Sequence, residues 1–144
     1  MSHNLSQLST NGEAALVGLL AKSLSASGCR VRLEVSNMGQ SVDIVATRGR
    51  WVTFIEAKMK DWRRALEQCR AHENIADFIC VAVSLKKAPQ DLISRVQERG
   101  YGLFLCNTNL HKCDLIVWPR RNKRVWVPQR RKVSAAMKDV PYAY

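Results

Sequence analysis

Three successive segments near the start of the chain have the hydrophobic pattern of β-strands. The first alternates apolar and polar residues, and the next two are short runs rich in β-branched, aromatic and other apolar residues. They cover residues 29–36, 42–47 and 51–58. Glycine-containing stretches typical of tight turns separate them, at residues 37–40 and 48–50. The pattern therefore predicts three short strands joined by turns.

Segments with helical periodicity precede and follow these strands. The first has leucines at every fourth position behind a sequence with capping-box spacing at residues 10–13, and Gly28 ends it. Asp61 is a typical N-cap for the second helix, and Pro89 opens the third. The predicted helices cover residues 11–27, 62–74 and 89–99, whereas residues 1–9 are polar and expected to be loosely ordered.

The rest of the pattern predicts one α/β domain with a basic extension. A continuous apolar run at residues 78–84 is typical of a strand buried on both faces. Further strands are expected at residues 100–106, 115–118 and 125–127, the last within an otherwise irregular segment. The order α-β-β-β-α-β-α-β predicts a mixed sheet flanked by helices over residues 1–118. A basic C-terminal extension over residues 119–144 is expected to pack on this domain or trail from it.

Length and composition agree with a single globular domain. The chain has 144 residues, 47% of them hydrophobic, which is enough to bury a core without disulfides or a metal. Its apolar runs are too short to span a membrane, and its first residues lack the basic and apolar regions of a signal peptide. The cysteines have no CxxC spacing, so we expect reduced thiols in a cytoplasmic protein. They are Cys29, Cys69, Cys80, Cys106 and Cys113.

The charge is large and unevenly distributed. The net charge is +11, and residues 111–138 contain nine basic residues and one acidic residue. A basic block of this kind favours a polyanionic partner, with nucleic acid first and an anionic membrane surface second. A solvated tail that only keeps the protein in solution would carry the same charge, so basicity indicates a class of partner and no chemistry.

Three charged residues stand inside two of the predicted strands, where a charge is costly unless it is paired, binds a metal or lines a cleft. They are Asp43, Glu56 and Lys58. If the turn at residues 48–50 closes a hairpin, Asp43 faces either Ile55 or Glu56. In the register that pairs Asp43 with Glu56, the two carboxylates are direct neighbours, with Cβ atoms about 5 Å apart. Lys58 shares the face of Glu56 because side chains alternate along a strand.

Two carboxylates at that distance suit Mg²⁺, for which Mn²⁺ can substitute, because Mg²⁺ takes one or two carboxylates and leaves its other positions to water and phosphate oxygens. Such a metal acidifies a bound water and neutralises charge on a phosphodiester. A nearby lysine can orient that water or stabilise a developing oxyanion. The alternative is an internal ion pair that only supports the sheet.

Asp43 is followed by twelve residues and then by Glu56-Ala57-Lys58. This spacing resembles the motif of the PD-(D/E)xK nuclease superfamily. The predicted order α-β-β-β-α-β is also similar to the restriction-endonuclease-like core of that superfamily. Val42 stands where the motif usually has proline. The resemblance implies that Asp43 and Glu56 bind the metal together with the backbone carbonyl of Ala57, and that Lys58 positions the attacking water.

Two further residues gain roles from the resemblance. Glu13, on the first helix, would reach the metal site, although the third position of a capping box already explains a glutamate there. Gln68 matches a glutamine that lines the active site in some of these nucleases, although a solvent-facing helix residue would look the same. His72 is a weaker candidate for a general base. In length and basicity the chain is similar to archaeal Holliday-junction resolvases, which implies a dimer that cuts branched DNA.

Basic residues around the predicted site and in the extension are candidates for contacts with a nucleic-acid backbone, with Trp118 and Trp126 available to stack on bases. For the basic residues of the extension, an edge strand protected by charge is an equally good explanation. The candidates are Arg48, Arg50, Lys60, Arg63 and Arg64 near the site, and Arg120, Arg121, Lys123, Arg124, Arg130, Arg131 and Lys132 in the extension.

Two other functions compete with the nuclease interpretation. Five residues could assemble a zinc site, although they lack a compact CxxC knuckle. They are Cys69, His72, Cys106, His111 and Cys113. The other alternative is a non-catalytic module that binds nucleic acid or a protein on a nuclease-like scaffold. We therefore predict a Mg²⁺-dependent enzyme that hydrolyses DNA, with RNA left open as a substrate.

Overall fold

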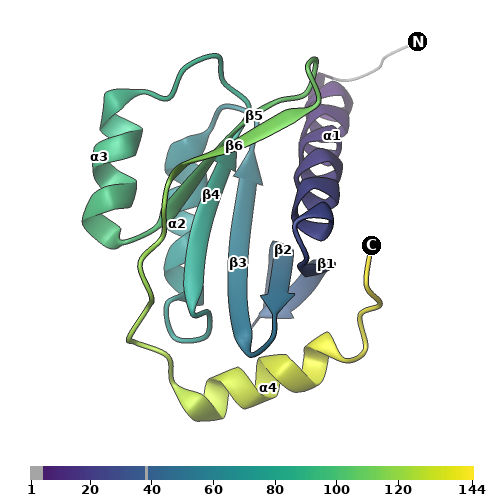
Figure 1. Cartoon of the computed structure of the whole chain (residues 1–144), viewed down its shortest axis with the longest axis vertical. Coiled ribbons are helices and arrows are strands. Elements are labelled where there is room, and N and C mark those ends of the chain that lie inside the picture. The colour runs from purple at the N-terminus through teal and green to yellow at the C-terminus, as the bar shows by residue number, and fades with distance from the viewer. Residues whose placement is uncertain (1–4, 38) are drawn as a thin grey trace.

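The computed structural model describes residues 5–37 and 39–144, which form a six-stranded mixed sheet with helices on both faces (Figure 1). The helices are α1 (Leu5–Ala26), α2 (Trp62–Cys69), α3 (Gln90–Arg99) and α4 (Val127–Met137), and a short 3-10 helix, η1 (Arg70–His72), follows α2. The strands are β1 (Arg30–Asn37), β2 (Gln40–Arg48), β3 (Trp51–Lys58), β4 (Phe78–Val83), β5 (Gly102–Asn107) and β6 (Lys112–Val117). None of the helices in the described part of the chain is long and apolar enough to cross a membrane.

The strands lie in the sheet in their sequence order, from β1 to β6. The first three form an antiparallel meander, β3 to β5 are parallel, and β6 returns antiparallel to β5. The parallel pairs need crossover connections, which α2 and α3 supply. The predicted fold class is therefore confirmed: a mixed sheet is flanked by helices, and its first elements follow the expected order α-β-β-β-α-β.

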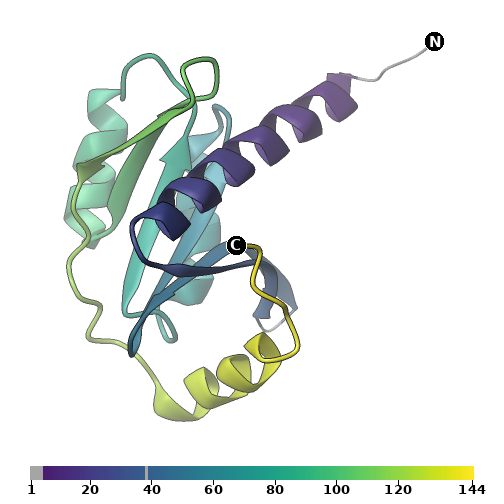
Figure 2. The ribbon, with the colours of Figure 1, turned by 45° about the vertical axis from the view of Figure 1, so that its right-hand side comes forward.

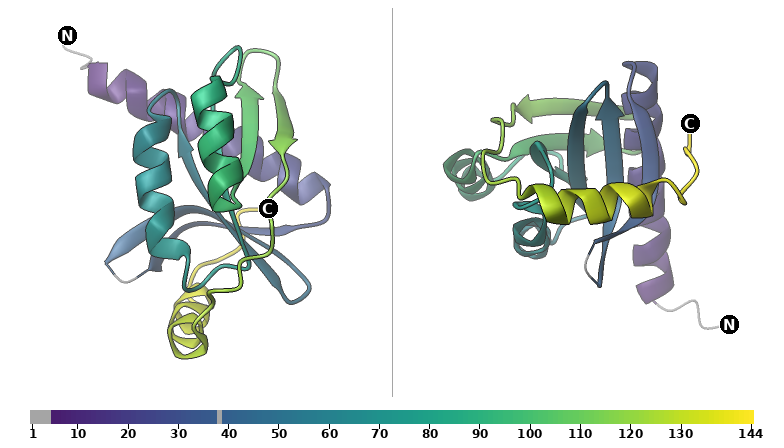
Figure 3. Two further views of the ribbon diagram at one scale, coloured as in Figure 1. Left: turned by 90° about the vertical axis from the view of Figure 1, so that its left-hand side faces the viewer. Right: turned by 90° about the horizontal axis from the view of Figure 1, so that it is seen from below.

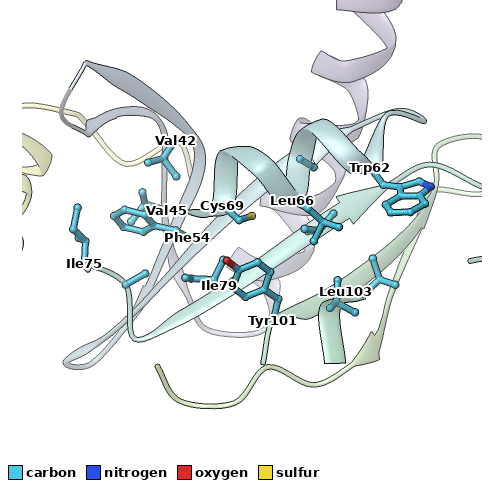
Figure 4. Close-up of a cluster of buried hydrophobic side chains, with 14 of the residues drawn as sticks. Val42, Val45, Phe54, Trp62, Leu66, Cys69, Ile75, Ile79, Tyr101 and Leu103 are labelled. Carbon is cyan, nitrogen blue, oxygen red and sulfur yellow. The ribbon is translucent and has the colours of Figure 1, made fainter. Parts of the chain in front are cut away.

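Each face of the sheet buries its own hydrophobic cluster. Helix α1 covers one face with Leu16 and Leu20, which pack with Ile55 of β3. Helices α2 and α3 cover the other face, where Phe54 and its neighbours form a larger cluster, and α4 lies across one end of the sheet and packs into the same cluster (Figures 3 and 4). Adjacent residues of β3 thus point into different clusters, as the alternation of side chains along a strand requires. The side chain of Glu56 emerges on the α2 side, within this buried surface.

The helix ends differ from the prediction in two places. Helix α1 begins at Leu5, so residues 10–13 lie inside it and do not cap it. Relative to alanine, Thr10 and Asn11 cost about 0.5 kcal/mol each in a helix interior and Gly12 costs about 1 kcal/mol, which continued helical hydrogen bonding offsets. Helix α2 begins as predicted, with the Asp61 carboxylate accepting the N–H of Arg64 at 3.2 Å, but it ends at Cys69 and tightens into η1. The expectations for residues 1–4 and Met38 lie outside the described residues.

The predicted strand at residues 125–127 is wrong, because Trp126 is the N-cap residue of helix α4. Pro128 occupies the first turn of this helix, where a missing N–H costs nothing, whereas a strand would lose a hydrogen bond there. Val133 and Met137 of α4 are buried in the larger cluster. The last residues continue past β1, where the N–H of Ala143 donates to the carbonyl of Val31 at 2.8 Å (Figure 2). Much of the C-terminal extension therefore packs against the sheet.

Arg130 ties helix α4 to the end of the sheet at which β3 and β4 begin. Its guanidinium lies 2.8 Å from the carboxylate of Asp77 and also donates to the carbonyl of Arg50 at 3.2 Å. Asp77 is buried and accepts the backbone N–H of Val52 at 2.9 Å. The arginine therefore neutralises an acid that β3 and the start of β4 hold away from water.

Replacing Arg130 with alanine is expected to lower the free energy of unfolding by about 2 kcal/mol, because it leaves the buried Asp77 carboxylate without its cation. The matched control is Arg131→Ala, whose side chain is exposed on the same helix and whose loss should change stability by less than about 0.5 kcal/mol. Urea denaturation followed by circular dichroism measures both values. Equal shifts in the two variants would contradict a structural role for Arg130.

Candidate functional site

The two carboxylates identified in the sequence meet where strands β2 and β3 stop pairing. The ladder runs from Arg48 opposite Trp51 to Ile44 opposite Ile55, which is the register that places Asp43 opposite Glu56. Beyond Ile44, the Asp43 carboxylate accepts the backbone N–H of Ala57 at 2.8 Å. The Asp43 side chain thus occupies the point at which the strands separate, and its position is held by the backbone of β3.

An open pocket of about 640 Å³ lies at this point. Its lining residues are Gln40, Ser41, Asp43, Glu56, Arg64, Glu67 and Gln68. Gln68 comes from α2, and its Oε1 atom is buried without a hydrogen-bond partner among the described residues. The tertiary structure therefore brings Asp43, Glu56 and Gln68, which come from three different elements, to one pocket.

Both carboxylates are held in an environment that disfavours their charge. The pKa of Asp43 is raised to about 6, first by burial and then by the neighbouring negative charge of Glu56, although the hydrogen bond from Ala57 lowers it. Burial is also the main reason that the pKa of Glu56 rises to about 7. Two acids side by side, the half-buried Asp43 and the buried Glu56, favour a bound cation, because a cation would stabilise their ionised forms.

Lys58 and Glu13 lie beside this pocket and pair with each other. The Lys58 ammonium is 3.3 Å from the Glu13 carboxylate, and both side chains remain partly exposed. The charge of Lys58 lowers the pKa of both Asp43 and Glu56, whereas the charge of Glu13 raises the pKa of Glu56. Helix α1 therefore contributes Glu13 to the same electrostatic cluster, although its contact is with the lysine.

His72, a weak candidate for a general base by sequence, lies behind Glu56. Its Nε2 atom is 2.6 Å from Oε1 of Glu56, and its Nδ1 atom is 2.9 Å from Nδ2 of Asn37. Burial lowers the pKa of His72 to about 4, so the imidazole is neutral near pH 7. The ring is fully buried, which separates it from any substrate in the open pocket. Asn37 was not predicted, because a polar residue at the end of a strand is typical of a turn.

The donors around the pocket fit a hard divalent cation. Asp43 and Glu56 supply two carboxylates, and the unpartnered Gln68 oxygen supplies a neutral donor, with the Ala57 carbonyl as the further donor that the sequence motif implies. Mg²⁺ is bound in proteins by such oxygen donors, often with only one or two carboxylates. Within residues 5–37 and 39–144, no three or more His, Cys, Asp or Glu side chains form a group that could hold a metal.

The predicted zinc alternative is wrong for the described residues. Cys69 belongs to the cluster under α2 and α3, whereas Cys106 belongs to the cluster under α1, on the opposite face of the sheet. Cys106 is the cross-strand partner of Cys113, and His72 is engaged by Asn37 and Glu56. Side chains on opposite faces of one sheet cannot converge on one ion.

The predicted nucleic-acid contacts near the site have different environments. Arg64 lines the pocket. Lys60, four residues earlier in the chain, is exposed. Arg63 forms an exposed pair with Asp91 at 3.5 Å. Arg48, by contrast, donates to the backbone carbonyl of Ser27, and Arg50 stacks on the ring of Trp51 at 4.6 Å. Of this group, Arg64 is the residue that the structure brings to the two carboxylates.

Four of the predicted contacts in the extension surround a second pocket, of about 420 Å³. They are Arg120, Arg121, Lys123 and Arg124, which line it together with Arg99, Tyr101 and Glu73. Glu73 already accepts hydrogen bonds from Tyr101 and from Arg124, so the lining retains a strong positive charge. Arg131 and Lys132 are exposed on α4. Arg130 differs from all of these because it is held by Asp77.

No family model and no curated protein matches the sequence. Several solved structures resemble this one, among them the following three. A protein of unknown function from Silicibacter pomeroyi aligns with a TM-score of 0.68 and 16% identity, over 88% of this chain and 83% of its own. An XisH family protein from Nostoc punctiforme aligns with a TM-score of 0.54 and 14% identity, over 74% of this chain and 99% of its own.

An fdxN element excision controlling factor protein from Anabaena variabilis aligns with a TM-score of 0.54 and 15% identity, over 72% of this chain and 98% of its own. At such low identities these likenesses show a common fold and assign no activity to this chain. The chain therefore shares its fold with these three proteins.

Proposed function

We propose that this protein is a Mg²⁺-dependent nuclease that hydrolyses DNA phosphodiester bonds. The observation that carries the proposal is the meeting of Asp43 and Glu56 in one open pocket at the point where β2 and β3 separate. A pair of neighbouring acids with raised pKa values would repel a phosphodiester, and a bound divalent cation would remove that repulsion. A module that only bound nucleic acid would gain nothing from such a pair.

Each residue of the site has a defined task in this proposal. Asp43 and Glu56 would hold the cation, with Gln68 and the Ala57 carbonyl available as further oxygen donors. When bound, Mg²⁺ supplies charge neutralisation at the phosphate and a more acidic water. Lys58, oriented by Glu13, would steer that water and stabilise the negative charge that develops on the phosphate oxygens.

The basic surfaces would hold the substrate. Arg64 is at the pocket itself, and the second pocket supplies further arginines away from it. Cations of this kind neutralise backbone phosphates without reading sequence. Arg64 at the first pocket and the basic lining of the second pocket would contact the substrate at two separate places. Two contact places suit a substrate with more than one duplex arm, so we propose branched DNA as the preferred form and a dimer as the assembly that cuts both strands.

Cleavage assays with the purified protein test the proposal. Wild type and Asp43→Asn would be incubated with plasmid, branched DNA and RNA in Mg²⁺, Mn²⁺ or EDTA. We expect metal-dependent cleavage of DNA by the wild type and a loss of at least about 100-fold in the variant, because it removes one of the two anionic ligands. Binding without cleavage under every metal would instead support the non-catalytic module.

The second pocket has its own test, the salt dependence of DNA binding. Lys123→Ala should weaken DNA binding several-fold and reduce the slope of log K against log salt concentration by about 1, because one phosphate contact is lost. Lys87→Ala removes an exposed lysine outside both pockets and should leave the slope unchanged. Fluorescence anisotropy with a labelled duplex at several salt concentrations measures the slope. Identical slopes for the two variants would remove the second pocket from the DNA-binding surface.

A further inference from the structure

We infer that His72 is a positioning residue that holds the Glu56 carboxylate in place through a single imidazole tautomer, which Asn37 selects. The inference rests on the proposed function, since it concerns Glu56 as a ligand of the cation. Asn37, His72 and Glu56 come from β1, η1 and β3 and are 1%, 0% and 2% exposed. No substrate reaches His72 at that depth, so any role for it in the site must act through Glu56.

The Asn37 amide determines which nitrogen of His72 carries the proton. Its Nδ2 group donates to the carbonyl of Ala71 at 3.2 Å, which fixes the orientation of the amide, because the opposite orientation would set two oxygens against each other. The same Nδ2 group lies 2.9 Å from Nδ1 of His72. An amide NH₂ only donates, so Nδ1 must be the acceptor and the proton of the neutral ring lies on Nε2.

The protonated Nε2 atom donates to Oε1 of Glu56 over 2.6 Å. This hydrogen bond holds one carboxylate oxygen from the core side and leaves the second oxygen for the pocket that Glu56 lines. The imidazole itself has little freedom, because the ring of Phe54 packs edge-on against it at 5.2 Å between centroids. The His72 carbonyl also accepts the N–H groups of Ile75 and Ala76, which anchors the backbone of this turn.

A carboxylate that is already held in place loses less conformational entropy when it binds a cation. Loss of a hydrogen-bond partner that orients a metal ligand commonly costs about 10- to 100-fold in metal affinity. Glu56 would otherwise be free to rotate within a buried site, where its charge is unfavourable. His72 should therefore affect how tightly the cation binds while making no contact with it.

The experiment is a titration of the metal-free protein with Mn²⁺ near pH 7, in which isothermal calorimetry measures the affinity. His72→Gln retains an N–H near the position of Nε2, whereas His72→Leu keeps a similar volume and removes the donor. We expect affinity within about 3-fold of wild type for His72→Gln and at least about 10-fold weaker for His72→Leu. Circular dichroism and thermal melts report whether both variants fold, which separates positioning from general loss of structure.

A second measurement needs no variant and no metal. Long-range ¹H–¹⁵N correlation spectra of the wild-type protein should show a neutral His72 with its proton on Nε2 at pH 7. A proton on Nδ1, or equal Mn²⁺ affinities for wild type and a folded His72→Leu, would overturn the inference while leaving the metal site intact. A wild-type protein that binds no Mn²⁺ would overturn the metal site, and with it the positioning of a metal ligand.

Discussion

Lys58→Ala is expected to reduce metal-dependent DNA cleavage by at least about 100-fold while leaving Mn²⁺ binding within a few-fold of wild type. The Lys58 ammonium pairs with Glu13 at 3.3 Å and its charge acts on both carboxylates, yet the residue does not line the pocket that they share. Removing it therefore deletes a positive charge that would act on the reacting phosphate and its water, and it leaves the cation's oxygen donors in place.

Single-turnover cleavage of a labelled DNA and Mn²⁺ calorimetry on the same preparations measure these two properties separately. Lys87→Ala, an exposed lysine outside both pockets, is the matched control and should cleave at the wild-type rate. Equal losses of cleavage and Mn²⁺ affinity in Lys58→Ala would contradict the assigned role, because they would show that the lysine serves only to build the metal site.

Asp43→Asn is expected to stabilise the metal-free protein at pH 8 although it removes activity. The pKa of Asp43 is raised by burial to about 6, above its value in an unfolded chain, so the folded state binds a proton more tightly than the unfolded state. The stability that this group supports is therefore complete below about pH 4 and is lost as the pH rises through about 6. Asparagine avoids this loss and still offers an oxygen to the N–H of Ala57.

We expect a gain of about 2 kcal/mol in the free energy of unfolding for Asp43→Asn at pH 8, about half of that gain at pH 5, where the carboxyl is ionised in the unfolded chain but still protonated in the folded one, and almost none below about pH 4. The effect of burying His72 on stability has the opposite sign with pH and is present in both proteins. Urea denaturation in the presence of a chelator, repeated from below pH 4 to pH 8, measures the gain. Parallel stability curves for the two proteins would contradict the raised pKa.

Added Mg²⁺ should reverse this order. A cation that binds the folded wild type stabilises it in proportion to the logarithm of the Mg²⁺ concentration above Kd, whereas Asp43→Asn has lost one of the two anionic ligands and should respond little. The same denaturation series with Mg²⁺ in place of the chelator tests this, and an equal response of both proteins would place the cation elsewhere.

Local patterns in the sequence were sufficient for most of the fold and for the first part of the site. The side chains of a strand alternate, so the turn at residues 48–50 restricts Asp43 to two positions relative to Glu56, and the structure adopts the one that makes them neighbours. The Asp61 cap is also a local signal. Helix α4 was missed although Pro128 signals a helix start, because charge dominates the composition of that segment.

The surroundings of the two carboxylates were decided by tertiary structure alone. Asn37 and His72 are 35 residues apart in the chain, and Arg130 is 53 residues from the acid that it neutralises. No periodicity relates such pairs, because their contact depends on how η1 and α4 dock against the sheet and on which buried polar atoms then need partners. The sequence by itself therefore determined that two acids and a lysine share one end of a hairpin. Only the packed fold decided that a neutral histidine supports Glu56 and that Arg130 holds helix α4 of the extension through Asp77. The reason is that a buried polar group without a partner costs too much free energy, so the packing of the fold selects the partners.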